Sequence, residues 1–68
     1  LTGLRDLSLF NARLTNPGAH EISAAPFVKQ LARLDLAGNR VRDSGALSVA
    51  NALDADRLVV FDLSGNPL

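Results

Sequence analysis

Apolar residues along this chain recur at a fixed spacing that fits neither one helix nor one strand. In residues 31–41 they stand at offsets 0, 3, 5 and 10, with an asparagine at offset 8. Residues 58–68 repeat this pattern, and residues 4–14 repeat it with Ala12 in place of the asparagine. The copies begin at Leu4, Leu31 and Leu58, so the step from one copy to the next is the same both times. A fixed period of this length indicates a repeat architecture.

Within each copy the spacing predicts a short strand followed by a turn. Leu34 and Leu36 are two positions apart, so both side chains point to one face of a strand while Asp35 points to the other. Gly38 then ends the strand. Asn39 has enough donors and acceptors to satisfy the backbone groups that a turn leaves free, which is a physical reason for it to recur.

After the turn, the hydrophobic period becomes helical. The residues at i, i+3, i+4 and i+7 that predict one apolar helix face are Ala46, Val49, Ala50 and Leu53. Asp43 precedes them as the expected N-cap, with Ser44 at the first helical position. We therefore expect a helix that begins at Ser44 and carries these residues on its inward face.

The first copy predicts a second helix in the same register. Asn16 is its expected N-cap and Pro17 suits its first turn, where a missing N–H costs nothing. The expected inward residues are Ala19, Ile22 and Ser23. Because Pro26 occupies the place of Leu53, this helix should end near Ala25, and Phe27 should supply the lost apolar contact.

The motif L-x-x-L-x-L-x-x-N-x-L at 31–41 and 58–68 resembles a leucine-rich repeat, and the Gly-Ala pairs at 18–19 and 45–46 resemble its ribonuclease-inhibitor-like subclass. The resemblance implies an α/β leucine-rich-repeat solenoid, a horseshoe with short parallel strands on the concave face and helices on the convex face. We therefore expect residues 1–68 to form one segment of a larger array. This segment should hold about two and a half repeats, and each repeat should be as long as the step from Leu4 to Leu31.

Composition narrows the possible partners. Seven basic and seven acidic residues cancel without clustering, which argues against a nucleic-acid surface or an anionic-membrane patch. The chain has no cysteine, so it can form neither a disulfide nor a cysteine-based zinc site. We expect no cofactor, no metal, no nucleic acid and no membrane partner. The compartment is not fixed by the sequence, and the cytoplasm is the default expectation.

The strand residues that point away from the core are the predicted contact surface. Its central column is Ser8, Asp35 and Asp62, flanked by Asp6, Arg33 and Val60 on one side and by Phe10, Ala37 and Ser64 on the other. We expect a non-catalytic scaffold that binds a protein partner through this concave face, and the acidic centre favours a basic partner. The alternative is that short polar residues simply occupy an exposed sheet.

No catalytic site is predicted. Asp35 and Asp62 are expected on neighbouring strands, about 4.8 Å apart, which is close to the separation of the two carboxylates in a retaining glycosidase. A general acid needs a raised pKa, however, and two carboxylates that are both exposed to water have nothing that would raise the pKa of one of them. His20 is expected to be exposed, with no serine near it and no further metal ligand besides Glu21. We therefore expect no enzyme activity.

Three other roles stay open: an architectural spacer, a regulatory arm of a larger enzyme, and a GTPase-regulating protein. The last follows from the family resemblance, because some relatives act on a small GTPase through the rim of the horseshoe. Here the rim would carry Arg13, Arg40 and Arg42. Self-association is also expected, because both ends of the sheet lack a capping repeat. The uncapped apolar residues are Leu4, Leu7 and Leu9 at one end and Phe61, Leu63 and Leu68 at the other.

Overall fold

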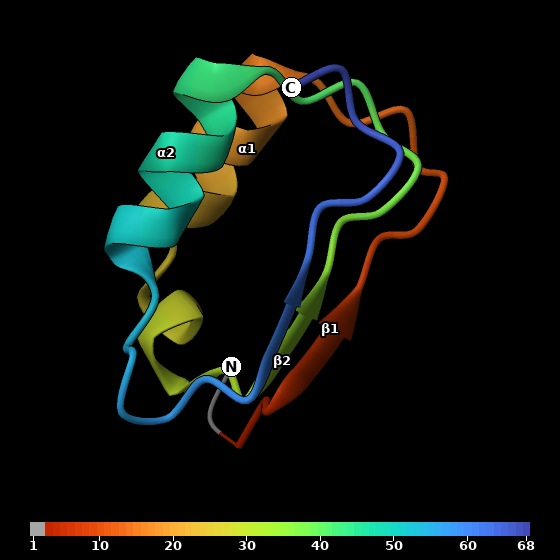
Figure 1. Cartoon of the computed structure of the whole chain (residues 1–68). Helices are drawn as coiled ribbons and strands as arrows, with labels where there is room; N and C mark the ends of the chain where they lie inside the picture. Colours follow the sequence, from red (N-terminus) through yellow and green to blue (C-terminus); the bar gives the residue numbers. More distant parts are fainter. Residues whose placement is uncertain (1–2) are drawn as a thin grey trace.

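The computed structural model describes residues 3–68, in which strands alternate with helices. The strands are β1 (Asp6–Ser8), β2 (Arg33–Asp35) and β3 (Val60–Asp62). The helices are α1 (Asn16–Ala24), the short 3₁₀ helix η1 (Pro26–Gln30) and α2 (Asp43–Ala52). Both α-helices lie on one side of the sheet, which leaves the other face of the sheet uncovered (Figure 1).

The sheet is parallel, and its register confirms the period found in the sequence. The strand order is β1-β2-β3, with Leu7 opposite Leu34 and Leu34 opposite Phe61. The backbone bonds repeat with the same step. Leu9 N–H donates to the Asp35 carbonyl at 2.8 Å, and Leu36 N–H donates to the Asp62 carbonyl at 2.9 Å.

The core lies between the sheet and the helices. The burial of the β2 residues confirms the alternation that the sequence predicted. Leu34 and Leu36 are fully buried, whereas Asp35 between them is only partly covered. The other fully buried large side chains are Leu31, Val28, Val41 and Val49.

The turn asparagine acts as predicted. Asn39 is buried, and its Oδ1 accepts the N–H groups of Ala12 at 3.0 Å and Leu14 at 2.9 Å. Its Nδ2 donates to the carbonyls of Leu9 and Leu36, each at 2.8 Å. One side chain thus ties the second turn to the backbone of the first.

The predicted helices are present, but the predicted caps are wrong. The N-cap positions are Thr15 and Arg42, and neither side chain makes a capping hydrogen bond. Asn16 instead caps the other helix, because its Oδ1 accepts the N–H groups of Gly45 at 3.2 Å and Arg42 at 2.9 Å. Gly45 lies against α1, so a Cβ there would stand 3.0 Å from the Ala19 Cβ. The cap therefore comes from a residue distant in sequence.

Two details of the helical segments also differ from the prediction. Ala50 is exposed rather than inward, because α2 buries the face that carries Gly45 and Val49. The segment after Pro26 forms η1, which was not predicted and which places Val28 in the core. Phe27 packs against the core as expected.

The predicted horseshoe-shaped leucine-rich-repeat solenoid of two and a half repeats is wrong. The described residues form a compact body of 29 × 19 × 17 Å with two α-helices packed on an open three-stranded parallel sheet. Within residues 3–68, no helix follows β3, so only two strand–helix units are complete. A body this short has no horseshoe curvature, and its strand face is not the concave side of one.

Candidate functional site

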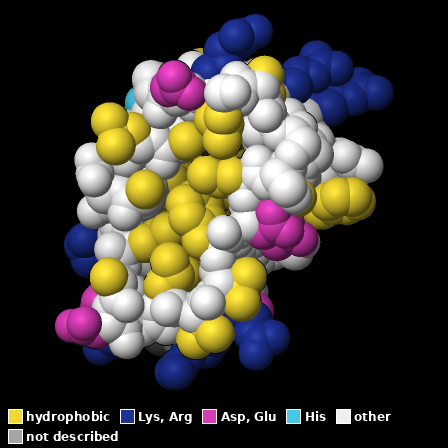
Figure 2. All heavy atoms as spheres, viewed as in Figure 1, with side chains coloured by type: hydrophobic (Ala, Val, Ile, Leu, Met, Phe, Trp, Pro, Cys, Tyr) yellow, Lys and Arg dark blue, Asp and Glu magenta, His cyan; other side chains and the backbone are white. Residues whose placement is uncertain are grey.

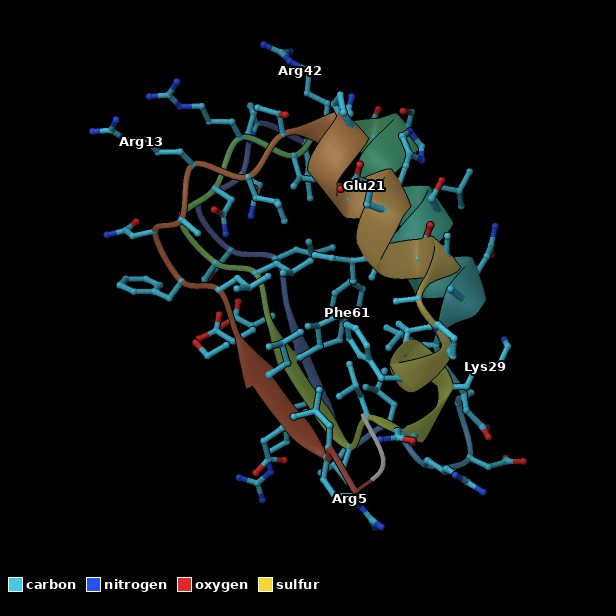
Figure 3. All side chains as sticks on the ribbon, turned by 180° about the vertical axis from the view of Figure 1, so that it is seen from behind. Arg5, Arg13, Glu21, Lys29, Arg42 and Phe61 are labelled. Carbon is cyan, nitrogen blue, oxygen red and sulfur yellow. The ribbon has the colours of Figure 1, made fainter. Side chains whose placement is uncertain are left out.

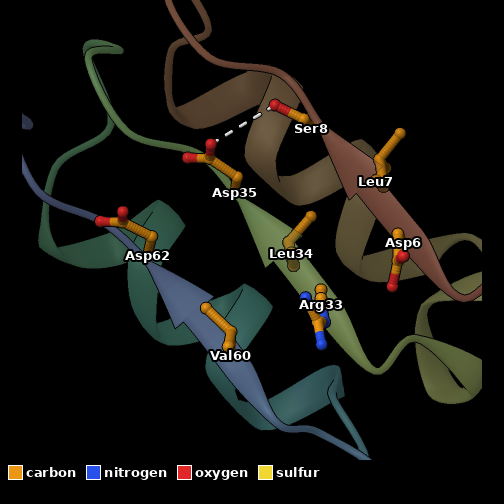
Figure 4. A pocket seen from close by; sticks show the side chains of 8 residues that line it. All are labelled: Asp6, Leu7, Ser8, Arg33, Leu34, Asp35, Val60 and Asp62. Atoms are coloured by element: carbon orange, nitrogen blue, oxygen red, sulfur yellow. Dashed lines mark hydrogen bonds between the residues drawn. The ribbon is translucent and has the colours of Figure 1, made fainter.

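The uncovered face of the sheet carries a shallow hollow of about 370 Å³ (Figure 4). Six of the nine residues predicted for the contact surface line it, two from each strand: Asp6, Ser8, Arg33, Asp35, Val60 and Asp62. Leu7 and Leu34 line it as well, although their side chains belong to the core. A sheet is one chain thick, so the backbone of core residues forms the floor of the opposite face.

The three remaining predicted residues, which belong to the turns, do not line the hollow. Phe10 belongs to the turn after β1 and is 60% exposed. Ser64 belongs to the turn after β3 and is also exposed. Ala37, which the spacing placed in the same outer column, is buried instead. Positions in the turns therefore do not follow the alternation that holds along the strands.

Asp35 and Asp62 stand side by side at the carboxyl ends of β2 and β3. Asp35 Oδ1 accepts the N–H of Ala37 at 2.9 Å, and its Oδ2 lies 3.4 Å from the Ser8 hydroxyl (Figure 4). Asp62 Oδ1 accepts both the N–H of Ser64 at 2.9 Å and its hydroxyl at 2.7 Å. Each carboxylate is thus held by the turn that follows its own strand.

The hydrogen bonds from Ser64 also affect the protonation of the Asp62 carboxyl. The backbone N–H of Ser64 and then its hydroxyl lower the pKa of the Asp62 carboxyl, and a small desolvation effect opposes them. A general acid needs a raised pKa to keep its proton at neutral pH. These hydrogen bonds therefore favour the ionised form of the Asp62 carboxyl, the opposite of the shift that a general acid needs.

His20 is exposed, as predicted, but the prediction that no serine lies near it is wrong. Its Nδ1 is 2.8 Å from the Ser48 hydroxyl and its Nε2 is 3.3 Å from the Ser44 hydroxyl. The ring bridges α1 to α2, and both nitrogens are engaged by hydroxyls. The hollow lies on the opposite face of the sheet, so this pair has no adjoining substrate site there.

The three predicted rim arginines lie in the loops that connect strands to helices. Arg13, Arg40 and Arg42 are all exposed, and Figure 3 shows the labelled Arg13 and Arg42 extending from the same end of the molecule. Arg13 has a φ of 59°, a left-handed conformation that a non-glycine residue seldom adopts. Nothing in their surroundings assigns a ligand to them.

Residues 3–68 offer neither a metal site nor a membrane-spanning helix. This part of the chain brings together no group of three or more histidine, cysteine or acidic residues that suits a metal ion. None of its helices is long and apolar enough to cross a membrane. No protein-family model, curated protein or solved structure matches the chain.

Proposed function

We propose that this chain is a non-catalytic protein-binding module that holds a basic segment of its partner against the uncovered face of the sheet. One observation carries the proposal. Asp35 and Asp62 are neighbours on an exposed face, where like charges on adjacent strands lower stability. A partner that brings a cationic side chain between them would relieve this repulsion.

The surroundings of the two carboxylates support the same role. Their Oδ1 atoms are occupied by the following turns, which fixes the orientation of each carboxylate. Val60 lies beside them with 46% of its surface exposed and offers an apolar contact for the stem of a lysine or arginine. A pre-oriented anion pair next to an apolar residue suits recognition of a long basic side chain.

A titration with short peptides tests the proposal. Amide resonances of the isotope-labelled chain are followed by NMR as a lysine- and arginine-rich peptide is added, with acidic and neutral peptides of equal length for comparison. We expect only the basic peptide to shift the resonances of Ser8, Asp35 and Asp62. Equal shifts with all three peptides, or with none, would contradict the proposal.

Two variants make the result specific. Asp35→Asn/Asp62→Asn removes two charges but keeps the Oδ1 acceptors of the turns, so the fold should persist while affinity falls by about fivefold. Glu21→Gln/Asp56→Asn removes two charges from exposed positions outside the hollow and should leave affinity unchanged. Equal losses in both variants would mean that only the total charge of the chain matters.

A further inference from the structure

The hollow on the uncovered face of the sheet is acidic at one end and basic at the other. Asp35 and Asp62 lie at the carboxyl ends of β2 and β3, whereas Arg33 lies two residues before Asp35 on β2. Figure 4 shows Arg33 and the two aspartates at opposite ends of the hollow. The surface therefore offers a ligand charges of both signs.

Arg33 has no ion-pair partner in the described part of the chain. The only ion pair within residues 3–68 joins Arg57 to Asp54, although Asp6 stands opposite Arg33 on β1. The Arg33 side chain is also exposed. A guanidinium keeps its charge throughout the physiological pH range and carries five N–H donors. Arg33 is thus available to an anionic group of a ligand.

The neighbours of Arg33 decide from which side an anionic group approaches. On the β1 side, the carboxylate of Asp6 would repel it. On the β3 side, the neighbour is Val60, which is uncharged and 46% exposed. A cationic group held between Asp35 and Asp62 lies over the same two strands. Both charged groups of a ligand would therefore lie along the gap between β2 and β3.

The spacing of these charges along β2 suits a ligand with an extended backbone. Arg33 and Asp35 are two residues apart on one face of the strand, which separates them by about 6.6 Å along its axis. An extended segment places its own residues i and i+2 on one face at the same distance. A helix instead brings residues three or four positions apart to about 5–6 Å, which is shorter than the spacing on β2.

Continuation of the strand–helix repeat would not cover this surface. The strands pair in chain order, so a further repeat would add a strand beside β1 or β3 and a helix beside α1 or α2. The hydrophobic side chains that Figure 2 shows between α2 and β3 lie where such a repeat would pack. The hollow lies on the other face of the sheet, which the helices leave open (Figure 1).

We propose that the hollow selects an extended partner segment in which a lysine or arginine stands two residues from an aspartate or glutamate. The basic side chain lies between Asp35 and Asp62, and the acidic side chain pairs with Arg33 on the side of Val60. This proposal rests on the function proposed above and specifies the segment that the hollow prefers. Arg33 is then a specificity-determining residue.

Blocked peptides of equal length test the proposal. Threonine, which favours an extended backbone, fills all positions but two. The spaced peptide contains Lys-Thr-Glu and is also made in the order Glu-Thr-Lys, because a segment can lie along β2 in either direction. The adjacent peptide has the same composition but contains Lys-Glu, and the uncharged control contains Lys-Thr-Gln. Affinities are measured by NMR from the amide shifts of Arg33 and Asp35 in the isotope-labelled chain.

The spacing of the two charges should decide the affinity. We expect one order of the spaced peptide to bind about threefold more tightly than either other peptide, which is the effect of one exposed ion pair. Net charge alone predicts that the Lys-Thr-Gln peptide binds best, because three aspartates and one arginine line the hollow. A spaced peptide that binds no better than either of the other two would overturn the proposal.

Variants of one exposed residue assign the preference. Arg33→Gln should remove it, and Arg33→Glu should reverse it, so that Lys-Thr-Lys binds better than a Lys-Lys peptide of the same composition. Arg40→Gln is the matched control, because it removes the same charge from an exposed position outside the hollow and should keep the preference. Circular dichroism checks that each variant folds. A preference for the spaced peptide that survives Arg33→Gln would overturn the proposal.

The outcomes separate this proposal from the function on which it rests. If the lysine- and arginine-rich peptide shifts the resonances of the hollow but the spaced peptide has no advantage, only the proposed charge spacing is wrong. If no basic peptide shifts these resonances, both proposals are wrong.

Discussion

The central copy of the motif and the two copies beside it differ in burial although their sequences are alike. Leu34 and Leu36 in the central copy are 0% exposed, whereas Leu7 on β1 and Phe61 on β3 remain partly exposed. β2 has a neighbouring strand on each side, whereas β1 and β3 are edge strands. Equivalent apolar positions therefore contribute differently to stability, because the number of neighbours rather than the residue type decides how much surface leaves water.

The largest effect that tests this comparison is expected from truncating equivalent leucines. Leu34→Ala should lower the free energy of unfolding by about 3 to 4 kcal/mol, because it opens a cavity in a fully packed site. Leu7→Ala should cost about 1 to 2 kcal/mol, because its site is partly open to water. Urea denaturation followed by circular dichroism measures both losses. Equal losses would show that the edge strand is as well packed as the centre.

The next largest effect concerns the two turn asparagines. Asn39→Ala should cost about 3 kcal/mol, because the N–H groups of Ala12 and Leu14 and the carbonyl of Leu9 lose their partner. Asn66→Ala should cost about 1 kcal/mol, because Asn66 is less buried and accepts a single N–H, that of Val41. Chemical denaturation compares the two variants. A larger loss of stability for Asn66→Ala than for Asn39→Ala would show that the third turn, and not the second, contributes more to the stability of the fold.

The repeat period predicted the strands, their faces and the presence of both helices because these depend on local residue order, although each helix begins one residue earlier than predicted. The role of Asn16 was missed, because the groups that it caps lie 26 and 29 residues further along the chain. The left-handed turn residue of the first copy, by contrast, could have been predicted from the sequence. Asn11 stands one full repeat before Gly38, and it takes a left-handed φ of 55°, which asparagine tolerates.

The candidate site was predicted in part for the same reason. Period-two alternation is enough to find which strand residues face away from the helices, and six of them line the hollow. The overall shape was not predictable in this way. A motif fixes the step from one unit to the next, but a horseshoe needs many steps, and the described part of the chain completes two strand–helix units. The contact of His20 with Ser48 was not predicted, because the two residues lie 28 positions apart on different helices and the hydrophobic pattern carries no signal for a polar contact between exposed side chains.

The smallest predicted effect compares the turns that follow β2 and β3. Both hold an aspartate by a backbone N–H, but the third copy adds the Ser64 hydroxyl where the second has Ala37. Ser64→Ala should therefore raise the pKa of Asp62 toward its usual value, since it removes the second of the two hydrogen bonds that lower it. An NMR titration of the Asp62 carboxyl carbon measures the change, and Ser8→Ala, which removes a hydroxyl from Asp35 instead, is the control.

The same hydrogen bond gives a pH dependence of known sign. Because the pKa of Asp62 is lower in the folded chain than in the unfolded chain, its ionised form stabilises the fold at pH values above the unfolded pKa. That contribution is lost as the pH falls through the folded pKa. Ser64→Ala should therefore reduce stability at neutral pH slightly and leave it unchanged at pH values below both pKa values. A loss of equal size at both extremes would show that the Ser64 hydroxyl supports the turn itself rather than the charge of Asp62.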